Sequence, residues 1–378
     1  MKKTIIITAL LCAAALVLRI GGRLVSGFAD FYIGHTNAFW VNTLGRLSSI
    51  FSFSLVEILI YMLIFGVVCW LLSLLILGCG GRKAAFLKAL KKGISIALPL
   101  AAMIFFLFES NEDIGFYRTP FASHYGYGSG SYSTEDLTEV CEMIADEINS
   151  CADSVNRDEN GIMVCDSGLR ERVKDGMIRL GKEYNWLSGM YSTPKPVLVS
   201  ELMSITNMAG IFSAYTMEAN YNADMTQYNL PFSISHELAH VKGILLENEA
   251  NFIAYLNCRN TEDADIYYAG MLSGWVYCGN ELIKRDKKIW EEIYYTLDER
   301  ARNDLRANNE FWASYKGKVS EAAESFNDSY LKGRGQTEGT LSYDRVVDLI
   351  VSYETGNMSK EQTDELSQAV MIRQERAE

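Results

Sequence analysis

Two histidines and two glutamates form the part of this sequence whose residue types and spacing can perform chemistry. His236, Glu237 and His240 make an HExxH pattern, and Glu247 follows seven residues after the second histidine. Side chains four residues apart on a helix lie on the same face, so the two imidazoles can converge on one ion. The pattern therefore predicts a zinc site on a helix.

These residue types match what a catalytic zinc ion needs. Such an ion takes three protein ligands and leaves a position for water, and two histidines with one glutamate are an established set. We expect His236, His240 and Glu247 as ligands and Zn²⁺ as the cofactor. Glu237 is expected to be the general base that takes a proton from the water.

Two residues on the second helix add to this set. Asn251 lies four residues after Glu247, on the same helix face. It is expected to orient His236 or His240 by a hydrogen bond to the ring nitrogen that does not bind the metal. Glu249 is an alternative third ligand. Residues two apart on a helix point in different directions, so only one of the two glutamates is expected to bind, and we prefer Glu247.

A solvated surface helix and a structural metal site are the two other interpretations of HExxH. The chain has only four histidines, and two of them lie in this five-residue motif, which disfavours chance placement. Structural zinc usually has four ligands and is rich in cysteine, whereas no cysteine lies between residues 230 and 254. A catalytic site is therefore the preferred interpretation.

Two helices joined by a short turn must position these side chains. Pro231 suits the first turn of the first helix and Gly243 suits the position after its end. The second helix is expected over residues 247–258, with its early glutamates near the positive end of the helix dipole. The short turn brings Glu247 back toward the two histidines.

A segment upstream of the motif, residues 210–222, has the composition of a strand. An edge strand at this place could pair with an extended peptide. Glu218 and Asn220 within it are expected to bind the amine of the substrate or, alternatively, to belong to the shell around the metal. With helical patterns elsewhere, the expected fold is mainly α with a small β-sheet, an α+β arrangement.

The amino-terminal part of the chain is strongly apolar. Three segments, at about 4–20, 50–77 and 93–108, are long and apolar enough to span a membrane. Residues 1–108 are therefore expected to form a membrane domain within a lipid bilayer. A cleaved signal peptide is the alternative for the first segment, but its apolar run continues past any small-residue cleavage site.

Basic residues predict the orientation of this multi-pass protein in the cell membrane. Five lysines and arginines lie between the second and third segments, and two lysines precede the first. Such residues favour the cytoplasmic side, so three spans place the chain after residue 109 outside the cytoplasm. Residues 21–48 are expected to form a short ordered loop, and Glu57 to lie at the level of the lipid headgroups.

The rest of the chain divides into a linker and a domain. Residues 109–133 have a turn-forming composition and are expected to be a juxtamembrane linker, followed by an extracytoplasmic domain over residues 134–378. The net charge of -12 excludes nucleic acid as a partner, because phosphate binding needs a basic face. The sequence sets neither the oligomeric state nor a pairing of the eight cysteines.

The motif resembles that of gluzincin zinc peptidases, in which HExxH is completed by a glutamate in an ExxxD or ExxAD helix. HELAH followed by ENEAN is similar to this arrangement. The resemblance implies His236, His240 and Glu247 as ligands and Glu237 as the base. Asn251 stands where that class usually has an aspartate, and the gap between the two motifs is shorter than in most of the class.

Nearly the whole chain resembles an uncharacterised family of bacterial membrane proteins, known only as a domain of unknown function and grouped with zincin-like peptidases by its motif. The resemblance is carried by GIFSAYTMEANYN, LPFSISHELAHVKG, ENEANFIAYL and FNDSYLKGRGQTEGTLSYDRVVDLI. It implies three amino-terminal spanning helices followed by a zincin-like metallopeptidase domain, and it supplies no substrate.

Two functions follow as alternatives. The first is a membrane-anchored zinc metallopeptidase acting on a peptide or protein substrate. The second is a catalytically inactive zincin-fold receptor or scaffold that binds a peptide or a component of the cell envelope. Glu237 favours the first, because a binding module needs no general base. The residues that could polarise the scissile carbonyl are Tyr267, Tyr268, Tyr277, Tyr330, Arg334 and Tyr343. None is assigned this role, because core packing is the commoner fate of aromatic residues at helical spacing.

Overall fold

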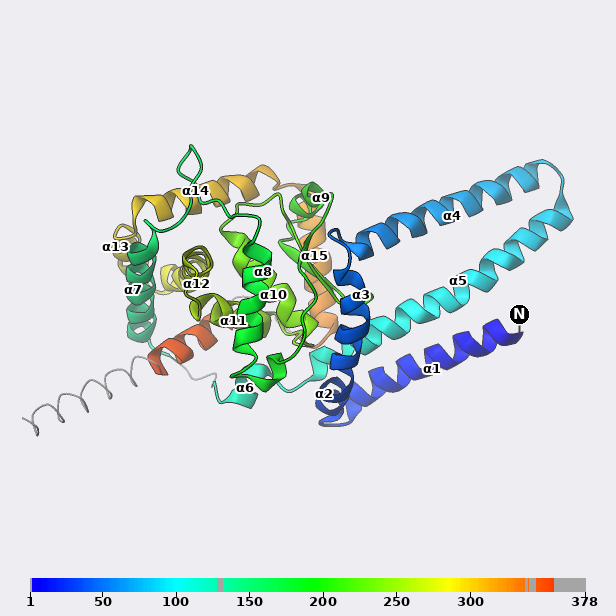
Figure 1. Cartoon of the computed structure of the whole chain (residues 1–378), viewed down its shortest axis with the longest axis horizontal. Coiled ribbons are helices and arrows are strands. Elements are labelled where there is room, and N and C mark those ends of the chain that lie inside the picture. The colour runs from blue at the N-terminus through cyan, green and yellow to red at the C-terminus, as the bar shows by residue number, and fades with distance from the viewer. Residues whose placement is uncertain (1, 128–131, 337–338, 340–344, 357–378) are drawn as a thin grey trace, which may run out of the picture.

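The computed structural model describes residues 2–127, 132–336, 339 and 345–356. Within these residues the chain is mostly helical and contains one three-stranded sheet, which confirms a mainly α fold with a small sheet. Figure 1 shows a helical domain and three long helices that leave it on one side.

Three helices are long and apolar enough to cross a membrane, as expected: α1 (Lys2–Leu24), α4 (Leu55–Cys79) and α5 (Lys83–Asn111). Most of their large apolar side chains are exposed, which is typical of surfaces that face lipid. The third helix begins earlier than expected, because the chain turns at Gly81, whose φ is 67°. Four of the five basic residues between the second and third spans therefore belong to α5.

The loop expected over residues 21–48 is largely helical instead. After α1 ends, α2 (Phe28–Trp40) continues through a π-helical turn, η1 (Val41–Gly45), into α3 (Arg46–Ser49). Buried positions recur about every four residues along it, so one face packs against the rest of the protein; they are Ala29, Ile33, Val41, Gly45 and Ser48. This periodicity was present in the sequence, but it lies between two stronger apolar segments.

Residues 109–133 do not form a free linker over the part that the structure describes. The last residues of α5 are buried, and they are followed by a 3₁₀ helix, η2 (Asp113–Tyr117), and by α6 (Phe121–Tyr125). Phe116 and Phe121 belong to the main hydrophobic core. The turn-forming residues here therefore separate short helices that belong to the domain.

The core of the domain is formed by helices whose buried faces meet around α10 and α11. α7 begins with a capping box in which Ser133 and Asp136 exchange hydrogen bonds. The core helices are α7 (Thr134–Cys151), α8 (Leu169–Leu180), α10 (Asn229–Val241), α11 (Glu247–Arg259) and α12 (Ala264–Arg285). Outside them lie η3 (Asn185–Leu187), α9 (Ser200–Ile205), α13 (Lys287–Tyr294), α14 (Glu299–Ser314) and α15 (Lys318–Gly333).

The sheet has the strand order β1-β3-β2. β1 (Lys195–Pro196) is parallel to the central strand β3 (Glu218–Tyr221), and β2 (Gly210–Ser213) is antiparallel to it. The expected strand at 210–222 is thus a hairpin of two strands. β2 lies at the edge of the sheet and contacts α10.

Candidate metal centre

Two helices and the turn between them bring the expected ligands together. His236 and His240 lie on α10, and Glu247 is the first residue of α11. Gly243 follows the end of α10 with a φ of 73°, and its N–H donates to the carbonyl of His240 at 2.9 Å. A left-handed glycine at this place ends the helix and reverses the chain, so that α11 returns alongside α10.

The three side chains point into one shared space. Oε2 of Glu247 is 3.2 Å from Nε2 of His236 and 3.8 Å from Nε2 of His240. One potential ligand atom from each of the three residues lies within 4.8 Å of the others, and no other group of three such residues occurs in the described ranges. Two imidazole nitrogens and a carboxylate oxygen are a donor set that suits zinc.

Hydrogen bonds behind the histidines fix how the rings face this space. Nδ1 of His240 is 2.7 Å from the carbonyl of Ile244, which can only accept, so Nδ1 carries the proton and Nε2 a lone pair. Nδ1 of His236 is 2.8 Å from Oδ1 of Asn251, the role expected for this residue. Such outer partners orient metal ligands and strengthen their basicity.

The electrostatics of the two histidines differ. Burial lowers the pKa of His240 to about 4, and the charge of His236 acts in the same direction. Burial also lowers the pKa of His236, but the hydrogen bond and charge of Glu247 outweigh it, so this pKa is raised. When both imidazole rings are neutral, the Nε2 atoms of His236 and His240 and the Oε2 atom of Glu247 all present lone pairs to the same space. A cation can bind between such atoms. The residues present therefore fit a zinc ion.

Glu237 lies on the same helix but belongs to a different environment. It accepts a hydrogen bond from the backbone N–H of Phe212, and its Oε2 is buried with no hydrogen-bond partner among the described residues. A Cβ added to Gly210 would lie 2.4 Å from Oε1 of Glu237, so the first residue of β2 has to be glycine for the carboxylate to fit. Burial raises the pKa of Glu237 to about 8.

Gly210 and Phe212 were not expected as part of the site. They approach Glu237 through the packing of β2 on α10, which no local spacing in the sequence indicates. The one available signal was a glycine at the start of the segment expected to be a strand, since glycine within strands often marks a close approach of backbone to another group.

Glu249 is directed away from the cluster. Its Oε2 accepts the backbone N–H of Ala122 at 2.8 Å, at the first turn of α6. Burial raises its pKa to about 7, and the N–H groups of Ala122 and Phe121 act in the opposite direction. Glu249 therefore holds the segment after η2 to α11 in this structure and is not one of the three clustered ligands.

Glu218 and Asn220 differ from the expectation of substrate contact. Both are fully buried on the central strand β3. Glu218 pairs with the buried ammonium of Lys195 and accepts the backbone N–H groups of Leu55 and Val56, each at 2.9 Å. These two N–H groups begin α4, where a carboxylate is favoured by the helix dipole. Asn220 donates to the carbonyl of Ile211 at 3.4 Å.

Glu57 bonds to the domain as well. Its carboxylate accepts the N–H groups of Leu198 at 2.7 Å and Val199 at 3.2 Å, and the hydroxyl of Tyr61 at 2.5 Å. The sequence predicted that Glu57 lies at the level of the lipid headgroups, but it did not predict these hydrogen bonds to the domain. We refer to Glu57, Lys195 and Glu218 together as the α4 clamp, because they fix the start of α4 to the sheet.

Three of the residues considered for polarising a carbonyl lie after residue 320, and two of these three have partners in η2 or in the residue before it. The hydroxyl of Tyr330 donates to Oε1 of Glu112 at 2.5 Å, and Nε of Arg334 is 2.5 Å from Oδ1 of Asp113. The third, Tyr343, lies outside the described residues. None of them is assigned a catalytic role here.

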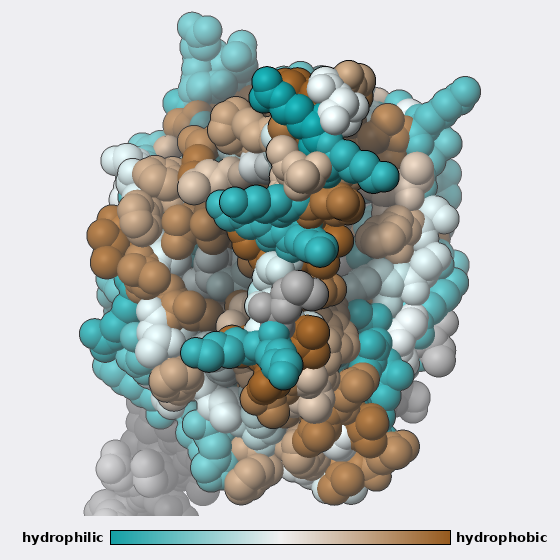
Figure 2. Space-filling model, turned by 90° about the vertical axis from the view of Figure 1, so that its right-hand side faces the viewer, coloured by the Kyte–Doolittle hydropathy of each residue, from teal (hydrophilic) through white to brown (hydrophobic). Residues whose placement is uncertain are grey.

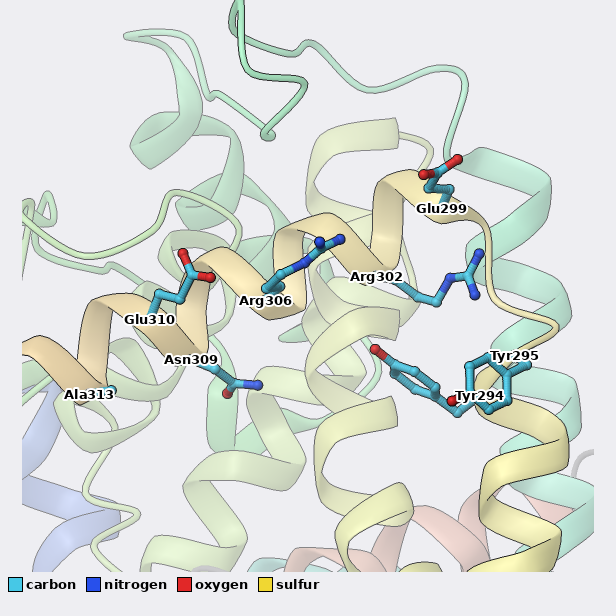
Figure 3. Close-up of a pocket in the computed structure, with 8 residues that line it drawn as sticks. All are labelled: Tyr294, Tyr295, Glu299, Arg302, Arg306, Asn309, Glu310 and Ala313. Atoms are coloured by element: carbon cyan, nitrogen blue, oxygen red, sulfur yellow. The ribbon is translucent and has the colours of Figure 1, made fainter.

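A surface hollow of about 660 Å³ lies between α13 and α14, and Figure 3 shows the polar side chains that project around it. Its lining contains Arg302, Arg306, Glu299 and Glu310 and neither histidine nor cysteine. It shares no residue with the metal cluster. A hollow without imidazole or thiolate does not suit zinc, so the candidate chemistry belongs to α10 and α11.

The arrangement defines a membrane protein with a candidate metal centre in its helical domain. The chain belongs to the family described as Protein of unknown function (DUF3810), whose family model matches residues 32–351. The match runs from within α2 to the helical residues near 350 and includes the whole metal cluster. No curated protein matches the chain. No solved structure matches it either.

Proposed function

We propose that this protein is a membrane-anchored zinc-dependent metallopeptidase that hydrolyses peptide bonds. One observation carries the proposal: the cluster of His236, His240 and Glu247 lies on the same helix pair as a separate buried carboxylate, Glu237, that is held by the edge strand β2. A structural metal site has no use for such a carboxylate. In a hydrolase it is the group that handles the proton.

His236, His240 and Glu247 would hold the zinc ion. When bound, zinc supplies Lewis-acid chemistry and lowers the pKa of a water toward neutrality. Glu237 takes a proton from the attacking water and donates it to the leaving amine. Glu237 is buried next to the proposed ligands, and its Oε2 has no hydrogen-bond partner among the described residues, so this oxygen is free to accept the proton.

The substrate would bind along β2. The sheet order leaves this strand with a neighbour on one side only among the described strands, so an extended peptide can add to its outer edge. Gly210 at the start of β2 approaches Glu237, which brings a peptide bound there close to the base. We place this domain outside the cytoplasm, on the strength of the basic residues at the other ends of the apolar helices.

The test uses the full-length protein in detergent or nanodiscs. Zinc content is measured by elemental analysis, and cleavage of a peptide library is measured by mass spectrometry. We compare the wild type with Glu237→Gln and with a control, Glu142→Gln, which changes an exposed glutamate of α7. We expect about one zinc per chain in all three proteins, and cleavage reduced roughly 10²- to 10⁴-fold in Glu237→Gln alone.

Other results would separate the two functions. Zinc in the wild type without cleavage of any peptide would contradict the peptidase and support the inactive receptor or scaffold. Wild-type protein that binds no zinc would contradict the peptidase and any scaffold that depends on zinc. Equal cleavage by the wild type and Glu237→Gln would show that this carboxylate is not the base.

A further inference from the structure

The elements of the metal centre contact the ends of the apolar helices directly. The side chain of Asn111, the last residue of α5, donates to the carbonyl of Ala214, the residue after β2, at 2.9 Å. The side chain of Asn37 in α2 donates to the carbonyl of Val241, the last residue of α10, also at 2.9 Å. Both the edge strand and the metal-binding helix are therefore fixed to the membrane-proximal part of the chain.

Further contacts strengthen this junction. A Cβ on Gly115 in η2 would lie 2.5 Å from the side chain of Leu245, in the turn between the two metal helices. Nη1 of Arg118 donates to the carbonyl of Lys242 in the same turn at 3.1 Å. On the sheet, the α4 clamp holds β3 against the start of α4. The site is thus joined to α2, α4 and α5.

The distance along the chain from lipid to site is short. The apolar run of α5 ends at Phe108, three residues before Asn111, which is about 4.5 Å of helix. The residue bonded by Asn111 directly follows the strand that we propose to bind substrate. The metal centre therefore lies close to the plane in which the apolar helices leave the domain, and not on the opposite side of the domain.

Exposed apolar side chains occur on the same face. Phe31 and Phe39 of α2 are 65% and 58% exposed, and Leu202 beside the clamp is 57% exposed. Figure 2 looks onto the face from which the apolar helices leave and shows apolar patches around them. With Leu47, Ile50 and Leu198 these residues form what we call the apolar collar.

The collar continues the surface that the apolar helices present to lipid, so its occupant is the bilayer surface. Helix α2 lies across the direction of the apolar helices, as Figure 1 shows. One of its faces is buried in the protein, and the other carries Phe31, Phe39 and the polar His35. Helices with such mixed faces lie in the plane of the membrane interface.

We infer that the metal centre lies next to the membrane surface and that its substrate is a polypeptide anchored in the same bilayer, cut close to its anchor. The inference rests on the proposed peptidase function and names its substrate class. A site this close to the bilayer surface contacts the first residues that follow the spanning helix of a neighbouring membrane protein. It meets a free peptide only by diffusion, whereas an anchored segment is held at high effective concentration.

The experiment measures how cleavage depends on the distance from the anchor. Full-length, zinc-loaded protein is placed in vesicles with substrates that carry one spanning helix, a Gly/Ser spacer and a randomised segment. One spacer has about eight residues, which reach at most about 28 Å, and the other has about forty. A domain of this size is roughly 45 Å across, so the short spacer cannot reach a site on its far side.

We expect the short-spacer substrate to be cleaved about tenfold faster, because effective concentration falls roughly as the −3/2 power of spacer length. Equal rates, or faster cleavage with the long spacer, would overturn the inference while leaving the peptidase intact. If neither substrate nor any free peptide is cut although zinc is bound, the peptidase function itself fails and the inference with it. Glu237→Gln protein in the same vesicles controls for contaminating proteases.

A paired variant tests the collar separately. Phe39→Asn should lower the rate on the short-spacer substrate several-fold and leave the rate on free peptides unchanged, because it changes how the domain lies on the bilayer. Tyr295→Asn is the matched control, since Tyr295 is 69% exposed next to the hollow between α13 and α14, away from the apolar helices. Equal effects of the two variants would contradict the role of the collar.

Discussion

The metal centre and the α4 clamp both bury a glutamate beside nitrogen atoms, yet the two regions are built in opposite ways. In the clamp, Glu218 faces only donors: the ammonium of Lys195 and two backbone N–H groups. In the metal centre, Glu247 faces the Nε2 atoms of two imidazoles whose Nδ1 atoms are already engaged. Glu218 is matched by fixed donors, whereas Glu247 shares a space with two imidazole nitrogens that can serve as metal ligands.

This difference separates a structural carboxylate from a candidate metal ligand. A carboxylate that is matched by donors contributes to folding, and its removal leaves those donors without a partner. A carboxylate that shares a space with two imidazole nitrogens is expected to help bind a cation, and its removal should mainly weaken that binding. Burial alone would not distinguish the two, because both glutamates lie in the interior or close to it. The partners of each carboxylate decide its role.

The largest expected effect is on stability, from breaking the clamp. Glu218→Ala leaves the buried Lys195 ammonium without its counterion, and loss of one partner of a buried pair costs about 3–5 kcal/mol of unfolding free energy. Glu247→Ala should change metal-free stability far less. Thermal unfolding of both variants in the same detergent, with zinc removed by a chelator, measures this difference.

Zinc binding should show the reverse order. Glu247→Ala removes a ligand and should weaken zinc binding by more than the 10- to 100-fold typical of losing an outer partner. The folded fraction of Glu218→Ala should bind zinc as the wild type does. A Glu218→Ala protein of normal stability, or a Glu247→Ala protein with wild-type zinc affinity, would end the contrast between the two regions.

The next effect concerns the strand that holds the base. Gly210→Ala places a methyl group where Oε1 of Glu237 now lies, so the base must move, while the three ligands are untouched. We expect cleavage to fall by about a hundredfold, the lower end of what a positioned base contributes, with zinc content unchanged. Ile211→Ala, which changes the next residue of β2, is the control. Loss of zinc in Gly210→Ala would show instead that the whole site had shifted.

The smallest of these effects comes from the residue behind His236. Asn251→Leu removes the acceptor for Nδ1 and should weaken zinc binding by about 10- to 100-fold. Asn251→Asp restores an acceptor, with a negative charge, and should bind zinc at least as tightly as the wild type. Competition with a fluorescent zinc indicator measures both. If the two substitutions have the same effect, the hydrogen bond to His236 does not support the metal.

The clustering of the three candidate ligands could be predicted because their relation is local. His236 and His240 are one helical turn apart, and a glycine-ended turn of a few residues returns Glu247 to them. Asn251 follows from the same periodicity on α11. Gly210 and Phe212 reach Glu237 only through the packing of a strand on a helix, which leaves no spacing signal in the sequence.

The other departures have the same origin. Glu218 was expected to contact substrate because it is polar and lies in a strand before the motif, but its N–H donor on Leu55 comes from 163 positions away. From the sequence alone Glu249 is an alternative ligand. Only the packing of α6 beside α11 shows that its carboxylate bonds the backbone of Ala122 instead. The three apolar helices were predicted because composition alone identifies them, whereas their ends were not, because those ends are shaped by the domain.

The hydrogen bond between Asn37 and Val241 joins positions 204 residues apart. At a synthesis rate of roughly 5–20 residues per second, about 10–40 s pass between the emergence of α2 and that of its partner helix. During that time Asn37 lacks this partner, whereas the apolar buried face of α2, with Ala29 and Ile33, packs against Leu18 of α1 and Ile114 of η2, which are made earlier than α10. We therefore expect α2 to pack against α1 and η2 before α10 is made, and protease protection of α2 in chains arrested before residue 229 would measure it.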